Sequence, residues 1–397
     1  MDDAVRYVTG TEKALLEARI VGALLARGVA RAGPAAFGRA FRDYLRSPRN
    51  LLRGGPGRYV RSRHGEVFAA TAMPPLNDPS FPDLVAEEVM AIAEGRPLPL
   101  LFGLLSVSSR CPYRCPHCYA LPELGPEEAV PLEALVQAVR DLAEAGARAV
   151  FFTGGEPLMR VEDLPVLVRT AREAGLRCFL VTTGHRADRE VLARLAEGGL
   201  AGVIVSLDGR DAATVARSKG NPGAFDVAVS ALRAAVQVGL LASVDCMVGP
   251  EVLDPEGFDR YLDFVGDLGV HFVNFFPAHP SGGAAVHGRF GLTPAEHARL
   301  ESLMARNNRG ARPRPLAWSA AVWEAPRGCV GGHQFIYANP LGQVRACPFL
   351  PRPVGDIVQG RLRDILATLR TGPAPSGCAP DLVRPSVPAP GDRLPPR

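Results

Sequence analysis

The stretch SSRCPYRCPHCYA, residues 108–120, places Cys111, Cys115 and Cys118 in a C-x3-C-x2-C pattern. Three thiolates this close together can hold one metal centre. A structural zinc site needs four protein ligands and usually presents two C-x2-C pairs, whereas a cubane iron–sulfur cluster has four irons that normally take one Cys each. Three Cys therefore leave one iron without a protein ligand, and an open coordination position is where metal chemistry takes place. The alternative is a zinc knuckle whose fourth ligand is His117 or a distant residue.

The composition is that of an ordinary globular protein. The chain has 397 residues, of which 47% are hydrophobic and 22% charged, and this length suggests about two or three domains. The net charge of +4 is too small to indicate nucleic-acid binding. Lys13 and Lys219 are the only lysines in the sequence, so nearly all positive charge is arginine. Because arginine is so frequent throughout the chain, a single Arg is weak evidence for a binding residue.

The beginning of the chain predicts neither export nor membrane insertion. It opens MDDAVRYVTG, which is acidic, and its first apolar run, Ile20–Ala26, is short and flanked by arginines. No stretch is long enough to span a membrane. We therefore expect a reducing cytoplasm, where closely spaced cysteines indicate metal sites more often than disulfides.

Residues 1–100 are predicted to form an N-terminal, mainly helical extension. Arginines accumulate in its second half with little acid among them, which is typical of a solvated face. Contact with a membrane surface or an acidic partner also fits this basic stretch. The expected elements are helices over 12–30 and 86–94 and a hairpin over 57–72 that turns at His64-Gly65.

Residues 101–310 alternate between apolar strands and amphipathic helices. Strands this apolar are buried on both faces, which favours a parallel sheet in an α/β domain. Six β/α units suit a partial (β/α)6 TIM-like barrel, with an open doubly wound sheet as the alternative, and in either fold chemistry belongs at the C-terminal strand ends. The predicted strands cover 104–109, 147–155, 177–184, 201–209, 241–249 and 270–278, and the helices 131–145, 161–174, 188–198, 224–238, 256–267 and 294–306.

Residues 311–372 differ from the barrel and are predicted to form a small module of a β-hairpin and a helix. Cys329 precedes a hairpin that turns at Asn339–Gly342, and Cys347 lies on its return strand. A helix is expected over 360–371. Residues 373–397 are Pro-rich and predicted to be disordered.

The cysteine pattern, followed one unit later by the GGEP segment at residues 154–157, resembles the radical S-adenosylmethionine (radical SAM) superfamily over roughly residues 101–290. The family form is C-x3-C-x-aromatic-C, and His117 stands at the aromatic place. The resemblance implies that the three Cys hold a [4Fe-4S] cluster whose fourth iron binds SAM. An electron from an external donor of the flavodoxin or ferredoxin type would then cleave SAM to a 5′-deoxyadenosyl radical, which abstracts hydrogen from a substrate.

The resemblance also implies a SAM site at the strand ends. Gly154 and Gly155 would let the strand edge approach the SAM amino group, with Glu156 helping to hold it. A buried carboxylate satisfied by backbone N–H groups is the alternative for Glu156. The other expected SAM-binding residues are Thr183, Ser206, Asp208 (which alternatively only shapes a turn with Gly209) and Arg217, whose guanidinium suits the SAM carboxylate.

Cys329 and Cys347, spaced as C-x12-G-x4-C, resemble the start of the SPASM and twitch domains, which carry auxiliary iron–sulfur clusters. A full SPASM domain continues with four closely spaced Cys, whereas only Cys378 follows here. The resemblance therefore implies a shorter, twitch-like module with one auxiliary cluster held by Cys329, Cys347 and Cys378. A hairpin whose cysteines bind zinc or nothing is the alternative.

The expected function is radical modification of a peptide or protein, although residues 1–100 contain no recognisable leader-peptide-binding domain. Modification of a small molecule, such as a tetrapyrrole, a sugar or a lipid-linked substrate, is the alternative. A zinc-binding structural or regulatory protein on the same barrel is a third hypothesis, and the intact GGEP segment beside the intact cysteine pattern argues against it. The sequence names no catalytic acid or base.

Overall fold

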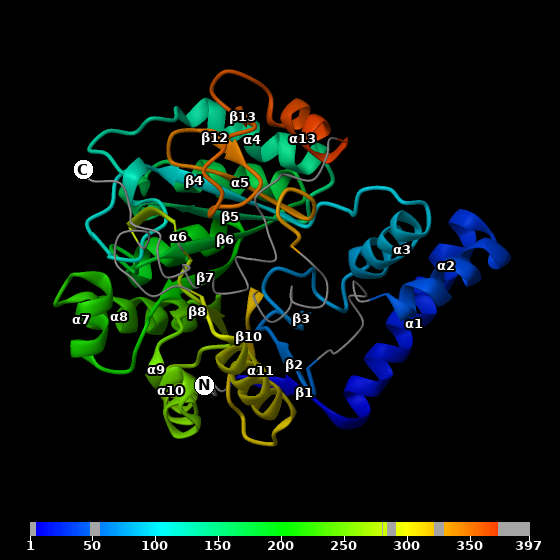
Figure 1. The fold of residues 1–397 in the computed structure, drawn as a ribbon, viewed down its shortest axis with the longest axis horizontal. Coiled ribbons are helices and arrows are strands. Elements are labelled where there is room, and N and C mark those ends of the chain that lie inside the picture. Colours follow the sequence, from blue (N-terminus) through cyan, green and yellow to red (C-terminus); the bar gives the residue numbers. More distant parts are fainter. Residues whose placement is uncertain (1–4, 48–55, 280, 284–290, 321–328, 372–397) are drawn as a thin grey trace, which may run out of the picture.

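The computed structural model describes residues 5–47, 56–279, 281–283, 291–320 and 329–371. Within these residues one sheet holds ten strands in the order β10-β9-β8-β7-β6-β5-β4-β11-β12-β13 (Figure 1). Six of its strands run parallel and follow the order of the chain, which confirms the predicted α/β core. They are β4 (Phe102–Ser108), β5 (Ala149–Gly154), β6 (Arg177–Thr182), β7 (Leu200–Ser206), β8 (Leu241–Met247) and β9 (Phe272–Phe276).

Helices cover the outer face of these strands. In the first of them Leu135, Val139 and Leu142 are fully buried at a spacing of three and four residues, so one helix face packs on the sheet. The predicted helices are α4 (Leu132–Glu144), α5 (Leu164–Glu173), α6 (Arg189–Gly198), α8 (Ala224–Gln237) and α10 (Pro255–Asp267). The sequence did not predict the short helices α7 (Ala212–Lys219) and α9 (Pro250–Leu253) or the 3-10 turns η1 (Leu121–Glu123) and η2 (Pro157–Arg160).

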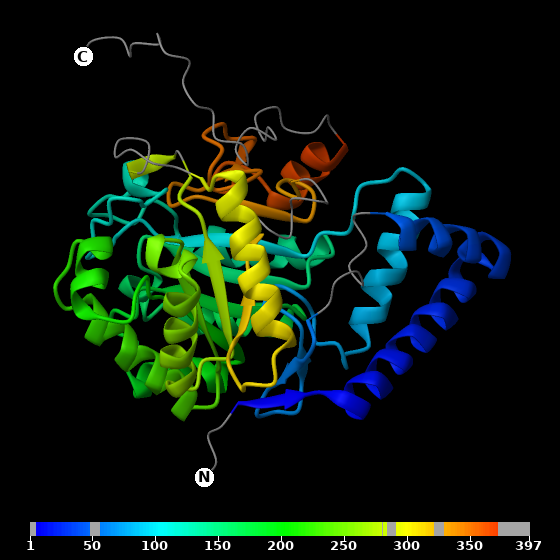
Figure 2. The same cartoon turned by 60° about the horizontal axis from the view of Figure 1, so that its bottom comes forward.

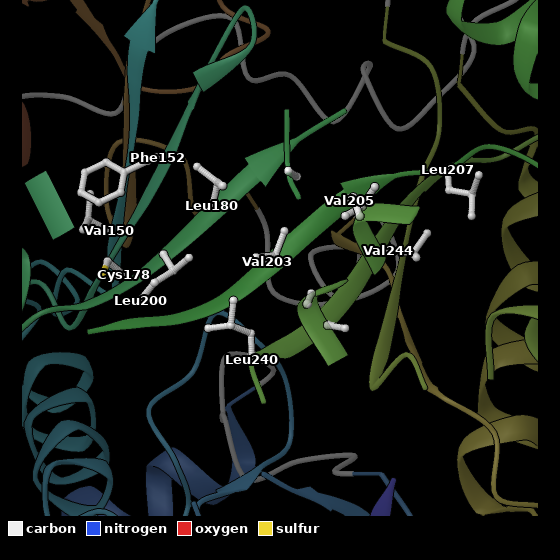
Figure 3. Close-up of a cluster of buried hydrophobic side chains, with 14 of the residues drawn as sticks. Val150, Phe152, Cys178, Leu180, Leu200, Val203, Val205, Leu207, Leu240 and Val244 are labelled. Carbon is white, nitrogen blue, oxygen red and sulfur yellow. The ribbon is translucent and has the colours of Figure 1, made fainter. Parts of the chain in front are cut away.

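The largest hydrophobic core lies between the sheet and these helices (Figure 3). Successive residues of a strand point to opposite faces of the sheet. Val150 and Phe152 of β5 therefore belong to this outer core, whereas Phe151 faces the barrel interior. Cys178 is fully buried in the outer core and serves as an apolar packing group there.

The barrel interior is filled at one end by an aromatic cluster. The Phe151 ring lies 5.1 Å from the Phe102 ring, edge to face, and 5.0 Å from the Phe179 ring, stacked. Val60 and Phe68 of the N-terminal extension pack into the same cluster. The extension therefore plugs the end of the barrel at which the strands begin, and leaves the C-terminal strand ends available for a site.

The N-terminal extension forms an arm on one side of the barrel (Figure 2). The predicted hairpin is present, with Arg61 paired to Val67 across its turn. The arginine-rich stretch forms a helix that was not predicted, because Phe37, Ala40 and Tyr44 are buried at helical spacing while the arginines point outward. The elements are β1 (Arg6–Val8), α1 (Gly10–Ala32), α2 (Pro34–Arg46), β2 (Tyr59–Arg61), β3 (Val67–Phe68) and α3 (Ser80–Ala93).

The segments after the sixth barrel strand extend both edges of the sheet. The first strand of the predicted hairpin pairs in parallel with β4, and a strand beside Trp318 pairs in parallel with β9. In the hairpin turn, Asn339 Oδ1 accepts hydrogen bonds from the backbone N–H groups of Leu341 and Gln343. The elements are α11 (Pro294–Arg309), β10 (Leu316–Trp318), β11 (Phe335–Ala338), β12 (Gln343–Arg345), β13 (Gly355–Asp356) and α13 (Leu362–Thr371).

The C-terminal hairpin is therefore continuous with the barrel sheet, and the boundary at residue 310 stays a prediction. The predicted tail over 373–397 lies outside the described residues. Among the helices that the structure describes, none combines the length and the apolar character needed to cross a membrane.

Candidate active site

The cysteine loop leaves the C-terminal end of β4 and is clamped by Glu128. The Glu128 carboxylate accepts hydrogen bonds from Ser108 Oγ at 2.8 Å, from the Ser109 backbone N–H at 2.9 Å and from Arg110 Nε at 2.7 Å. These bonds fix the direction in which the chain enters the loop before Cys111. Sequence reasoning missed Glu128, because no spacing rule links a carboxylate to partners that lie 18 to 20 residues earlier in the chain.

Gly154 and Gly155, at the end of β5, pack against the backbone of the same loop. The Gly155 N–H donates to the Ser108 carbonyl at 2.8 Å. A Cβ on Gly154 would come within 2.5 Å of that carbonyl oxygen, and a Cβ on Gly155 within 2.4 Å of the Arg110 carbonyl oxygen. The two glycines are thus required to seat the cysteine loop. Their contact with the SAM amino group stays a prediction.

The three thiols of the loop lie close enough to influence one another. Burial, together with the charges of Glu156, Cys115 and Cys118, raises the pKa of Cys111 to about 12. Burial likewise raises the pKa of Cys115 to about 11. Thiolates in such surroundings need a strongly cationic partner, which a metal centre supplies.

The donor set fits a cluster better than a single ion. Among the described residues, no group of three or more His, Cys, Asp or Glu side chains converges as one metal ion requires. In a cubane cluster each thiolate binds a different iron, so the sulfur atoms need not converge on one point. His117 is accordingly not needed as a fourth zinc ligand, and its ring instead lies 3.9 Å from Asp208, measured from Nε2 to Oδ2.

Glu156 is fully buried and already holds four hydrogen bonds. Its carboxylate accepts from Thr182 Oγ1 at 2.6 Å, from Thr183 Oγ1 at 2.6 Å and from the Thr183 N–H at 2.8 Å. The fourth donor is the Leu158 N–H at 3.1 Å. Burial raises the pKa of Glu156, and the hydroxyl and N–H donors oppose that rise. Glu156 therefore ties the end of β5 to the end of β6, and its predicted contact with SAM would add to this role.

The C-terminal strand ends open onto a cavity of about 700 Å³. Its lining includes His117, Ser206 and Asp208 of the predicted SAM-binding residues. The other strand-end residues that were predicted, Gly154, Gly155, Glu156 and Thr183, hold the surrounding loops in place. Most of the wall is apolar or aromatic, and the N-terminal arm closes one side through α1 and α3.

A buried ion pair lies at the polar end of the cavity. Lys219 Nζ is 2.8 Å from Asp208 Oδ2, and both side chains are 6% exposed. Burial alone would raise the pKa of Asp208, but the Lys219 ammonium, His117 and the Ser218 hydroxyl lower it to about 2. Asp208 Oδ1 also accepts from the Met247 N–H at 2.9 Å. Asp208 is therefore an ionised group within the site, and the structure assigns no turn at Asp208 and Gly209.

Lys219 was missed by the sequence, which favoured Arg217 two residues earlier. The structure places Arg217 on the exposed side of α7, where its Nη2 donates to Thr214 Oγ1 at 3.2 Å. Lys219 instead lines the cavity, and its carbonyl oxygen lies 3.7 Å from Cys115 Sγ. The binding of the SAM carboxylate by Arg217 stays a prediction, whereas the buried cation beside the cysteine loop is Lys219.

A second carboxyl that the sequence did not single out faces the cavity. Asp245, on β8, accepts a hydrogen bond at Oδ1 from Asn274 Nδ2 on the neighbouring strand β9, at 2.8 Å. Burial raises the pKa of Asp245 to about 6. Among the described residues, no ion pair forms to this carboxyl. A carboxyl that faces a cavity and whose pKa is raised by burial is typical of a functional position.

Cys329 and Cys347 line the same cavity from the C-terminal side. A Cβ on Gly331 would lie 3.5 Å from Cys329 Sγ and 3.3 Å from Cys347 Cβ, so the two cysteines flank one point of the chain. Cys347 is buried and Cys329 is exposed. Cys378, the third predicted ligand, lies outside the described residues. Cys329 and Cys347 thus line the cavity that His117 and Tyr119 of the first cysteine loop also line, although more than 200 positions separate them from that loop in the sequence.

Comparisons with known proteins match much of the chain to one family. The sequence model of the Radical SAM superfamily matches residues 105–265. The PqqA peptide cyclase of Rhodopseudomonas palustris is 32% identical over 275 residues, which cover 66% of this chain and 70% of that protein. The Fe-coproporphyrin III synthase of Methanosarcina barkeri is 40% identical over 143 residues, about a third of each chain (34% of both).

A solved structure shares the fold. The structure of Streptococcus suis SuiB bound to its precursor peptide SuiA superposes with a TM-score of 0.59 and 15% identity, over 77% of this chain and 75% of that one. At this identity the likeness concerns the fold alone. The superposed part of this chain is longer than residues 105–265, which the family model matches.

Proposed function

Because the chain belongs to the radical SAM superfamily, we propose that it modifies a peptide or a protein by abstracting a hydrogen atom from it. Enzymes of this family use a [4Fe-4S] cluster and SAM, and these are the cofactors of this chain. Two names support a peptide substrate. One relative is called a PqqA peptide cyclase, and the SuiB structure was solved with a precursor peptide.

We assign the cluster to Cys111, Cys115 and Cys118. Reductive cleavage of SAM at the cluster supplies the 5′-deoxyadenosyl radical, which takes a hydrogen atom from a C–H bond of the substrate. The chain contributes position and surroundings. Glu128 and the two glycines fix the loop, and the apolar wall excludes the water that would compete with the substrate.

The polar residues at the strand ends are proposed to hold SAM. His117, Ser206 and Asp208 face the cavity and can meet its ribose or methionine part. The Lys219 ammonium offers a cation for the SAM carboxylate, at the cost of sharing its charge with Asp208. Asp245 on β8 is paired in the sheet with Ser206 on β7. Asn274 holds its Oδ1, so its Oδ2 is available to accept a hydrogen bond from a donor group of the substrate.

Cys329 and Cys347 are proposed to hold an auxiliary iron–sulfur cluster, with Cys378 as a further ligand. Their position on the wall of the cavity would place that cluster beside the substrate, where it can anchor the substrate or exchange electrons with it. The reducing electron is proposed to come from a flavodoxin- or ferredoxin-type donor in the cytoplasm. This assignment is supported by the position of Cys329 and Cys347 on the cavity that His117 and Tyr119 of the first cysteine loop also line, which is also the observation that carries the proposed function.

A tetrapyrrole is the second candidate substrate. The relative with 40% identity over its matched segment is named an Fe-coproporphyrin III synthase. The apolar, aromatic wall of the cavity suits a flat macrocycle as well as an apolar peptide segment. A peptide or protein substrate is larger than a tetrapyrrole, so separating the candidate substrates by size distinguishes the two proposals.

The experiment uses a deuterated extract of the cells that make this chain, separated by size into a macromolecular and a small-molecule fraction. The enzyme is reconstituted without air and incubated in ordinary water with a reductant, unlabelled SAM and one fraction. The mass of the 5′-deoxyadenosine formed then reports whether its new hydrogen came from a component of that fraction. The triple variant Cys111→Ala, Cys115→Ala, Cys118→Ala is the control.

We expect deuterium in 5′-deoxyadenosine only with the macromolecular fraction and only with the wild-type enzyme. Deuterium from the small-molecule fraction alone would replace the peptide with the small-molecule candidate. Cleavage of SAM without deuterium transfer from either fraction would contradict hydrogen abstraction from both substrate classes.

A further inference from the structure

The cysteine loop leaves the first site toward the C-terminal hairpin. Directly after Cys118, the Tyr119 ring lies 5.8 Å from the Tyr337 ring of β11 and 5.9 Å from the Phe349 ring, edge to face in both pairs. Such aromatic pairs add to the stability of the surfaces that they join. The exit of the loop therefore packs on a segment that lies outside the six strands of the barrel core.

A buried ion pair joins the same two segments. Glu123, at the end of η1, places Oε1 2.6 Å from Nη2 of Arg345 on β12. The two side chains are 10% and 11% exposed. Among the described residues, the pair of Asp208 and Lys219 is the only other ion pair in which both side chains are buried this well.

The two charges depend on each other. Among the described residues, Glu123 Oε2 and Arg345 Nε find no hydrogen-bond partner, although both atoms are buried. Gln343 Oε1, which also accepts from Arg345 Nη2 at 3.3 Å, is neutral. A buried charge is costly unless an opposite charge compensates it, so each of the two groups holds the other in this place. Exposed ion pairs contribute much less.

A short run of backbone hydrogen bonds connects Glu123 to the cysteines. The Glu123 N–H donates to the Ala120 carbonyl at 2.9 Å. The Leu121 N–H donates to the Cys118 carbonyl at 3.3 Å, and the Cys118 N–H to the Cys115 carbonyl at 3.1 Å. Because these turns follow one another directly, a shift of Glu123 is passed on to Cys118.

We propose that Arg345 is a positioning residue of the first cysteine site, which acts through Glu123 to hold Cys118 in the place that SAM binding requires. Arg345 would fix the exit of the loop as Glu128 fixes its entry. The inference rests on the proposed function, because it needs the cluster and SAM at the first site. It gives the hairpin a role that does not depend on a cluster at Cys347.

The test separates positioning from stability. Reconstituted full-length protein is prepared as the wild type, as Arg345→Met, as Arg345→Lys, and as the double variant Glu123→Gln, Arg345→Met, which removes both charges. Iron content, the dissociation constant for SAM by equilibrium dialysis and the melting temperature are measured for each. Arg363→Met is the matched control, because Arg363 forms an ion pair with Glu144 in which the side chains are 48% and 51% exposed.

We expect Arg345→Met to lower the melting temperature, because Glu123 is left buried without its partner, and to weaken SAM binding by about tenfold. The double variant should regain the melting temperature of the wild type, since no buried charge remains, yet still bind SAM about tenfold more weakly. Arg345→Lys, which keeps the charge, should bind SAM more tightly than Arg345→Met. Arg363→Met should match the wild type in SAM binding.

Two results would overturn the proposal. One is an Arg345→Met variant that binds SAM as tightly as the wild type. The other is a double variant whose SAM affinity recovers together with its melting temperature, because the ion pair would then be a stabilising contact alone. A wild type that binds neither iron nor SAM would contradict the proposed function itself, and this inference with it.

Discussion

The two cysteine sites differ in how firmly the described chain holds them. The loop of Cys111, Cys115 and Cys118 is clamped by Glu128 and seated on Gly154 and Gly155. Cys329 and Cys347 lie before and after the hairpin of β11 and β12, outside its strands, and Cys329 is exposed. The difference indicates a division of labour. Under the proposed function, the first site would need a fixed geometry because the radical would start there, whereas the second would adapt to a substrate or support it.

The largest expected effect separates the two sites by their cofactor. Replacing Cys111, Cys115 and Cys118 with Ala should remove about four irons and abolish SAM cleavage. Cys347→Ala should remove the auxiliary cluster but leave SAM cleavage in the absence of substrate near its wild-type rate. Iron and sulfide counting with a 5′-deoxyadenosine assay measures both. Loss of SAM cleavage in Cys347→Ala would show that the first site depends on the second, which would contradict their separate roles.

Lys219, which lies beside the loop of the first site, provides a test of how firmly that end of the cavity is held. Lys219→Met leaves Asp208 ionised and buried without its partner, which typically costs about 3–5 kcal/mol. The exposed Arg217→Met on the same helix is the matched control and should change stability by no more than about 0.5 kcal/mol. Thermal unfolding measures both variants. Equal effects of the two substitutions would mean that the buried ion pair does not stabilise this end of the cavity.

Gly155→Ala tests how tightly the cysteine loop is seated. Its Cβ would come within 2.4 Å of the Arg110 carbonyl oxygen, so the loop or β5 must shift. Overpacking of this kind costs about 1–3 kcal/mol, and the cluster content should fall with it. Gly125→Ala is the control, because a Cβ there meets nothing within 4 Å. Iron content and melting temperature that stay at the wild-type level in Gly155→Ala would rule out this seating role.

The effect expected at Asp245 depends on pH. Burial raises the pKa of Asp245 from 3.8 to about 6, so the folded protein favours the protonated carboxyl. The wild type therefore gains stability as the pH falls through about 6 and loses it as the pH rises. Asp245→Asn, which carries no charge, should be more stable than the wild type at pH 8 by about 3 kcal/mol, and this advantage should shrink as the pH falls from about 6 toward 4. Unfolding curves for both proteins across this range measure it, and an advantage independent of pH would contradict the assignment.

The sequence predicted what local patterns encode. The six parallel strands follow from apolar runs alternating with amphipathic helices, and the hairpin follows from the turn at Asn339 and Gly342. The cysteine pattern and the GGEP segment gave the family, because both are short and contiguous. The helix α2 was missed because its arginines masked the buried spacing of Phe37, Ala40 and Tyr44.

The residues that the sequence missed depend on distant partners. Glu128 and Lys219 acquire their roles from groups that fold against them, and nothing in their own neighbourhoods distinguishes them from surface charges. Asp245 differs, because it lies within the apolar strand predicted over 241–249, and this position was the signal that could have found it. Lys219 shows the dependence on distant partners most clearly. Arg217 was preferred because arginine suits a carboxylate, yet the path of α7 turns Lys219 into the cavity and Arg217 toward solvent. The pairing of β11 with β4 joins segments more than 200 residues apart, which no local pattern reveals.

The account rests on the claim that the first cysteine site binds SAM at an open iron, while the second lies on the wall of the neighbouring cavity without that role. The direct measurement is electron paramagnetic resonance of the reduced protein, with and without SAM, on two variants that each keep one site. In Cys347→Ala, SAM should change the spectrum of the remaining cluster. In the Cys111, Cys115, Cys118→Ala variant, SAM should leave the spectrum of the auxiliary cluster unchanged. A SAM-dependent change in the second variant, or none in the first, would contradict the account.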